Sequence, residues 1–141
     1  MFASLNNPAA AYRQAGVEPQ PTTAPPHELV LMLYDGALAS IASASHHMRS
    51  GNVSEKGSAI SKAIEIIDTG LKACLDYRSG GDLAERLAAL YEYMNNPLVH
   101  ANLRNDNGAL GEVSGLLREL RDAWQEISSD SAVVSPTKAA A

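Results

Sequence analysis

The stretch VSEKGSAISKAIEIIDTGLKACLDY, residues 53–77, decides the fold class. Its apolar residues recur at gaps of three, four and seven, which places them along one side of a helix: Val53, Ile60, Ile64, Ile67, Leu71, Cys74 and Leu75. The other side carries polar residues and is expected to face solvent: Glu55, Lys56, Ser58, Ser61, Lys62, Glu65, Asp68, Lys72 and Asp76. Such a helix is not stable alone, so the stripe predicts helical partners.

Size and composition fit one small aliphatic domain. The chain has 141 residues, of which 45% are hydrophobic and only 5% aromatic, so aliphatic side chains and alanine must fill the core. The net charge of −5, with no basic stripe, argues against binding to nucleic acid. The single cysteine, Cys74, excludes an internal disulfide, and its place on the apolar stripe predicts a buried, inert thiol.

The sequence shows no recognisable signal for export or membrane insertion. No apolar run approaches the roughly 18 residues that a membrane span needs, so membrane insertion is not expected. The N-terminus lacks the basic region and apolar centre of a signal peptide. A cytoplasmic protein is therefore the default expectation.

Three further helices are predicted around the first one. One runs from residue 26 to about residue 49, and its stripe consists of Val30, Leu33, Ala37, Ile41, Ala44 and Met48. After a turn at residues 78–81, Asp82 and Glu85 form a capping-box-like start for another, with the stripe Leu83, Leu87, Leu90, Met94 and Leu98, flanked by Tyr91 and Tyr93. A turn at residues 105–108 precedes the last helix, whose stripe is Leu110, Val113, Leu117, Leu120, Trp124 and Ile127.

These elements predict an all-α protein, an antiparallel four-helix bundle with a mobile N-terminal arm. The arm is residues 1–25, which hold four of the seven prolines; the bundle is residues 26–128; and residues 129–141 form a disordered tail. Trp124 is expected to lie in the core.

Two local features leave alternatives open. Pro97 lies inside the third predicted helix, where proline removes a backbone hydrogen bond, so we expect a kink or break at residues 95–97. Gly111 and Gly115 leave a smooth strip on the last helix, which either permits close packing within the bundle or forms a groove for a partner.

The sequence lacks the constellations that enzymes and metal sites require. His46 and His47 are adjacent, so on a helix they point about 100° apart and cannot bind one metal together. There is no Glu-x-x-His pair and no phosphate-binding glycine loop. We therefore expect no catalysis, metal or cofactor. What remains is surplus apolar surface at residues 29–34, which is either deeply buried or covered by a partner protein.

Several blocks of the chain resemble the flagellar secretion chaperone FliS. They are AYRQ (residues 11–14), PHELVLMLYDGA (26–37), KGSAISKAIEIIDTGLKACLD (56–76), GGDLAERLAALYEYM (80–94), ANLRND (101–106) and EVSGLLRELRDAW (112–124). The match covers about four-fifths of the chain in order and spacing. Each block alone is a weak signal, whereas together they are specific.

The resemblance implies a small cytoplasmic bundle that binds the disordered C-terminal region of flagellin in an apolar groove. Binding would prevent premature polymerisation and aid delivery to the flagellar export machinery. Some family members associate as dimers and some bind an anti-sigma factor, so both are among the partners to consider here. The departure from the family is NNPLVH, residues 95–100, where an uninterrupted helix is usual. It puts the straightness of the third helix and the adjoining groove in doubt, and is compatible with a divergent second copy.

The expected partner contacts lie on the arm and on the first and third helices. They are Tyr12, Gln14, Leu29, Met32, Leu33, Gly36, Leu90, Tyr91, Met94, Leu98 and Asn102. Tyr12 matches the arm tyrosine of the family, and we hypothesise that it lies over a groove lined by those two helices until flagellin displaces it. Two other function classes stay open: a regulatory module for an anti-sigma factor or another flagellar protein, and an enzyme.

Overall fold

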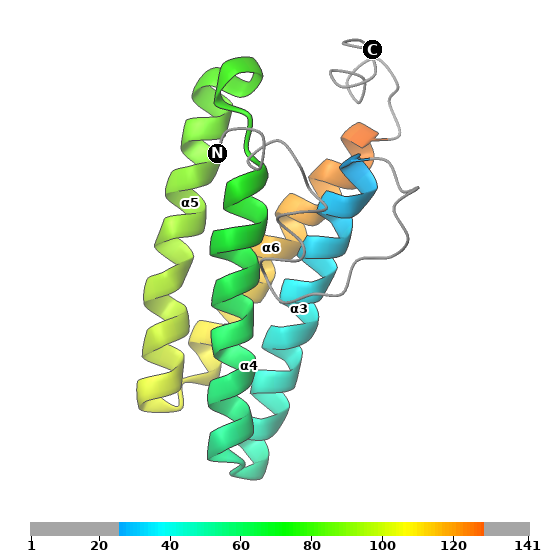
Figure 1. Ribbon diagram of the computed structural model, residues 1–141. Coiled ribbons are helices and arrows are strands. Elements are labelled where there is room, and N and C mark those ends of the chain that lie inside the picture. Colours follow the sequence, from blue (N-terminus) through cyan, green and yellow to red (C-terminus); the bar gives the residue numbers. More distant parts are fainter. Residues whose placement is uncertain (1–25, 129–141) are drawn as a thin grey trace.

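Four helices run alternately up and down in the computed structural model, which describes residues 26–128 (Figure 1). They are α3 (Pro26–Ser50), α4 (Val53–Glu65), α5 (Tyr77–Arg104) and α6 (Asn107–Ser128). Helix α4 continues directly into a π-helical turn, η1 (Ile66–Leu71), and a 3₁₀ turn, η2 (Lys72–Cys74). The predicted all-α class and antiparallel four-helix bundle are confirmed for this part of the chain. The predicted arm and tail lie outside the described residues.

Each helix has two neighbours in the bundle. Helix α3 packs against α4, η1 and α6, whereas α5 packs against α4, η1 and α6 from the opposite corner. Helices α3 and α5 are therefore diagonal to each other. A groove lined by the first and third helices, as the sequence suggested, does not form between diagonal helices, because α4 and α6 separate them.

The core is aliphatic, as the composition predicted. Its largest fully buried side chains are Leu33, Ile60, Ile66, Ile67, Leu71, Met94, Leu98, Leu110, Val113 and Leu117. Fully buried alanines such as Ala37, Ala63 and Ala101 allow close approach of the helices. Three stripe assignments are wrong: Val53 is 69% exposed, Leu83 62% and Ile127 37%. Val53 lies in the first turn of α4, Leu83 directly after a kink in α5 and Ile127 in the last turn of α6, so few neighbours cover them.

The junction of α4 and α5 differs from the predicted turn at residues 78–81. The chain leaves helical geometry at Leu75, and the Asp76 carboxylate accepts hydrogen bonds from the N–H groups of Arg78 (3.1 Å) and Ser79 (3.3 Å). Asp76 therefore caps the helix in place of Asp82, and the bond from Ser79 is the main cause that lowers the pKa of Asp76. The two glycines of the predicted turn lie inside α5, where Gly81 produces a kink with a φ of 50°.

Helix α5 passes through Pro97 without the predicted kink or break. Its only non-helical backbone angles are at Gly81, and Pro97 is itself buried. Met94 and Leu98, on the same side of the helix, are fully buried in the core. Core packing on this face thus offsets the cost of about 3 kcal/mol that an interior proline carries.

Helix α3 is long and apolar enough to cross a membrane by length and composition alone. The sequence expectation that no segment approaches a span was therefore too strong. A core helix passes the same test, and Leu33, Ala37 and Ile41 of α3 are buried against the other helices. The apolarity of residues 29–34 is thus used largely for packing, with Leu29, Leu33 and Tyr34 buried.

Candidate docking groove

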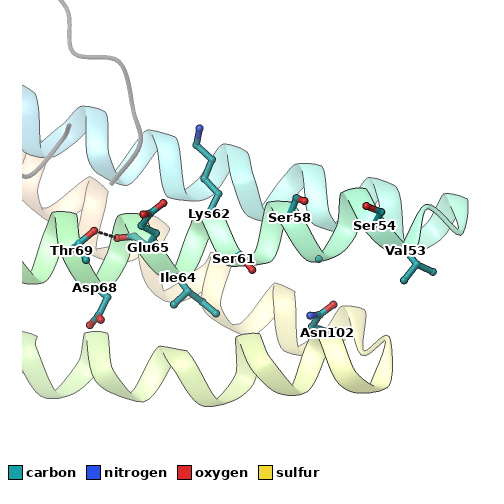
Figure 2. A pocket seen from close by; sticks show the side chains of 11 residues that line it. Val53, Ser54, Ser58, Ser61, Lys62, Ile64, Glu65, Asp68, Thr69 and Asn102 are labelled. Carbon is teal, nitrogen blue, oxygen red and sulfur yellow. Dashed lines mark hydrogen bonds between the residues drawn. The ribbon is translucent and has the colours of Figure 1, made fainter. Parts of the chain in front are cut away.

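An open groove of about 820 Å³ runs along the outer side of α4 and η1 (Figure 2). It is lined by Val53, Ser54, Gly57, Ser58, Ser61, Lys62, Ile64, Glu65, Asp68, Thr69 and Asn102. Only Asn102 comes from α5. The groove is long and open, and its lining is mainly small and polar. Such a surface suits an extended or helical chain segment better than a small molecule, which requires an enclosed pocket.

The side chains of the groove are divided between its two sides. Figure 2 shows Ile64 and Asp68 directed toward α5, whereas Lys62 is directed away from it. Ile64 is half-buried against the core and Val53 is largely exposed, so each offers apolar surface to a partner. Gly57, beside Asn102, and the serines carry little side-chain bulk, so the floor of the groove stays open.

A buried lysine fixes one end of the groove. Lys56, which the sequence pattern placed on the solvated side, is only 4% exposed. Its Nζ donates to the carbonyl oxygen of Asn102 (3.0 Å) and to Oδ1 of Asn105, the residue that ends α5 with a left-handed φ of 53°. The last carbonyls of a helix lack partners and attract positive charge. The end of α5 therefore draws Lys56 inward, and the start of α4 is tied to α5.

An ion pair fixes the other end. The Lys72 ammonium lies 2.8 Å from the Glu92 carboxylate on α5 and 3.8 Å from Asp68. The hydrogen bond to Glu92 is the main cause that raises the pKa of Lys72. Beyond it, burial raises the pKa of the Cys74 thiol to about 12, which keeps it protonated at neutral pH. The described residues include no cluster of three His, Cys, Asp or Glu that could hold a metal.

A smaller hollow of about 520 Å³ lies between α5 and α6. Its lining is Tyr93, Asn96, Pro97, His100, Asp106, Gly108, Ala109 and Glu112. Tyr93 donates to the Glu112 carboxylate, which raises the pKa of Tyr93, and His100 Nε2 lies 3.2 Å from Asp106 Oδ2. These polar groups of the hollow are therefore engaged with each other.

The residues expected to contact a partner do not gather on one described surface. Tyr12 and Gln14 lie outside the described residues. Leu29, Leu33, Tyr91, Met94 and Leu98 are buried in the core, whereas Met32, Gly36, Leu90 and Asn102 are partly exposed. Only Asn102 lines the α4 groove. Their role in binding stays a prediction, and the buried ones can reach a partner only if helices move.

Sequence reasoning did not select the α4 face as a site. The available signal was the recurrence of small residues on its polar side, Ser54, Gly57, Ser58 and Ser61, at spacings that bring them together on a helix. A polar helix face more often faces solvent, so this signal was interpreted as a solvated surface.

Comparison with known proteins identifies the family. A family model described as "Flagellar protein FliS" matches residues 6–131. The flagellar secretion chaperone FliS of Salmonella typhimurium strain LT2 is 49% identical over 118 residues, 84% of this chain and 87% of that protein. FliS of Escherichia coli K12 is 47% identical over 116 residues (82% and 85%), and FliSB of Pseudomonas aeruginosa PAO1 is 45% identical over 117 residues (83% and 92%). The chain therefore belongs to the FliS family of flagellar secretion chaperones.

Proposed function

We propose that this protein is a cytoplasmic, non-enzymatic export chaperone that binds the disordered C-terminal region of flagellin and keeps it from polymerising before secretion. Membership of the FliS family supports a chaperone role in flagellar export. The observation that carries the choice of a chain segment as ligand is the open groove along α4 and η1, tied to α5 at both ends.

The proposed mode of binding is an amphipathic helix that forms as it lies in the groove. Val53 and Ile64 offer apolar contacts, while the hydroxyl groups of the groove can bond the polar groups of the incoming segment. The carboxylates of Glu65 and Asp68 favour a basic residue on the partner at that end. A segment that folds on binding loses part of the gain to its own ordering, which keeps the complex releasable at the export gate.

Titration of the purified chain with the C-terminal segment of the flagellin from the same organism tests the proposal. Ser61→Arg would fill the groove and should weaken binding by at least about tenfold, equal to about 1.4 kcal/mol. Ser43→Arg, an exposed serine on α3, is the matched control and should leave affinity within about twofold. A parent chain that binds no flagellin segment would refute the function. Equal affinity of both variants would exclude the α4 groove as the site.

An anti-sigma factor, the export machinery and a second copy of the chain are further partners, and each of them stays a prediction. Residues 95–97 were the feature that favoured a regulatory module for an anti-sigma factor, because a broken third helix would have altered the surface. Since α5 runs continuously through Pro97, that argument no longer holds. Contacts with the export machinery and a homodimer have no specific surface assigned to them here. Adding an anti-sigma factor as a competitor in the same titration would show whether it shares the groove.

A further inference from the structure

The stretch after Glu65 departs from α-helical hydrogen bonding in two steps. The N–H of Ile66 is shared between the carbonyls of Ala63 and Lys62, three and four residues back, whereas the N–H of Lys72 bonds the carbonyl of Ile67, five residues back. The N–H of Leu75 then bonds Lys72, three residues back. A wide π-helical turn is thus followed by a tight 3₁₀ turn. Such turns are rare and occur frequently at functional positions.

The π-helical turn lies against the core. Two adjacent pairs, Ile66–Ile67 and Gly70–Leu71, are buried together. Residues four apart share one face of a helix, so both pairs face the other helices. The turn is therefore held between the core on one side and the groove on the other.

Thr69 bonds the backbone at the start of the turn. In an α-helix the Glu65 carbonyl accepts from the N–H of Thr69, four residues on, and in a π-helical pattern from the N–H of Gly70, five residues on. The Thr69 hydroxyl donates to the Glu65 carbonyl at 2.7 Å (Figure 2). The hydroxyl thus competes for the acceptor that the backbone N–H of Thr69 would use in an α-helix.

This turn also forms one end of the docking groove. Glu65, Asp68 and Thr69 line the groove, and Asp68 is directed toward α5 (Figure 2). Lys72, the first residue after the turn, reaches Glu92 on α5. A return to α-helical hydrogen bonding would rotate Asp68 and Lys72 relative to the first half of α4. The shape and charge of the groove end therefore depend on the turn.

We propose that Thr69 is a positioning residue that holds the π-helical turn of α4, and that this turn sets the end of the groove for the partner segment. The first claim, that Thr69 holds the turn, is the structural half of the inference and stands alone. The second claim, that the turn sets the groove end for the partner, is the binding half and rests on the proposed function. Thr69 itself needs no direct contact with the partner for this role.

The test compares Thr69→Val, which keeps the shape but loses the hydroxyl, with Thr69→Ser, which keeps the hydroxyl, in the full chain. Amide exchange by NMR should accelerate across residues 66–72 in Thr69→Val by about five- to tenfold, the factor that one net hydrogen bond is worth. Affinity for the flagellin segment should fall by a similar factor. Thr69→Ser should stay close to the parent in both measurements.

Different failures have different meanings. If Thr69→Val and Thr69→Ser behave alike in exchange, the hydroxyl does not hold the turn and the inference is overturned. If exchange accelerates but affinity is unchanged, the link from the turn to the groove is overturned. If the parent binds no flagellin segment, the proposed function fails, and with it the binding half, while the exchange experiment still decides the structural half.

Discussion

Tyr34 and Tyr91 place two hydroxyl groups inside an otherwise aliphatic core. Their oxygens lie 2.6 Å apart and join α3 to α5 across the diagonal of the bundle. Burial raises the pKa of Tyr34 to about 12 and also raises that of Tyr91, so both hydroxyl groups stay protonated and one donates to the other. The sequence placed Tyr91 beside the stripe of the third helix, but only 3% of it is exposed.

Tyr91→Phe should lower the free energy of unfolding by about 1–3 kcal/mol, because the buried hydroxyl of Tyr34 loses its partner. The double variant Tyr34→Phe/Tyr91→Phe should lose clearly less than the sum of the two single variants, since no unpaired hydroxyl remains. Urea denaturation followed by circular dichroism measures all three. Strictly additive losses would show that the two hydroxyl groups do not depend on each other.

Lys56 is the one buried charged residue of the described core. Lys56→Met keeps the length of the side chain but removes the donor to Asn102 and Asn105, and should lower the free energy of unfolding by about 1–3 kcal/mol. Arg118→Met, at an exposed position of α6, should change it by no more than about 0.5 kcal/mol. Equal losses in the two variants would contradict a specific role for the buried ammonium.

At the scale of the element, α6 carries two glycines without a packing reason. A Cβ atom added at Gly111 or Gly115 would meet nothing within 4 Å, and both residues are exposed. Close packing within the bundle, one of the two interpretations of the sequence, is therefore wrong for the described residues. The other interpretation, a surface that a partner covers, remains a prediction.

Gly111→Ala and Gly115→Ala should each raise the free energy of unfolding by about 1 kcal/mol, because alanine favours a helix interior that glycine disfavours. Gly81→Ala is the control of opposite sign: at a φ of 50° it should lower stability by about 1–2 kcal/mol. Thermal denaturation compares them. If the alanines at 111 and 115 stabilise the chain but weaken flagellin binding, a partner covers this surface. If they destabilise the chain, the space around the two glycines is not open.

At the scale of the whole molecule, Trp124 joins the two ends of the described chain. Its Nε1 donates to the carbonyl oxygen of His27 at 2.9 Å, which connects the last turns of α6 to the first turn of α3. Arg121, one turn earlier on α6, pairs with Asp35 on the same helix α3. The indole was expected to be core, but it is only partly buried, at the edge of the core cluster.

Trp124→Phe should lower the free energy of unfolding by about 0.5–1.5 kcal/mol, the net worth of the lost hydrogen bond. Trp124→Ala should cost more, but less than the about 3–5 kcal/mol of a fully buried indole. Urea denaturation followed by far-UV circular dichroism is suitable, because the fluorophore is lost. A loss in Trp124→Ala at the top of that range would show that the indole is packed as a full core residue.

Much of this architecture follows from the sequence alone. The apolar stripes placed α3 and α6 within about a turn of their observed bounds, and Pro26, Gly51 and Asn105 mark helix ends that local backbone preferences explain. These features are predictable because periodicity and capping depend on residues within one or two turns. Family membership was also readable from the order and spacing of short blocks.

Tertiary structure decided the features that depend on hydrogen-bond acceptors or packing surfaces on a helix distant in sequence. Lys56 is buried because the end of α5 offers it two hydrogen-bond acceptors. Helix α5 continues through Pro97 because the residues before and after the proline are packed in the core. The docking groove has the same origin, since the polar face of α4 becomes a groove only where Lys56 and Lys72 tie it to α5.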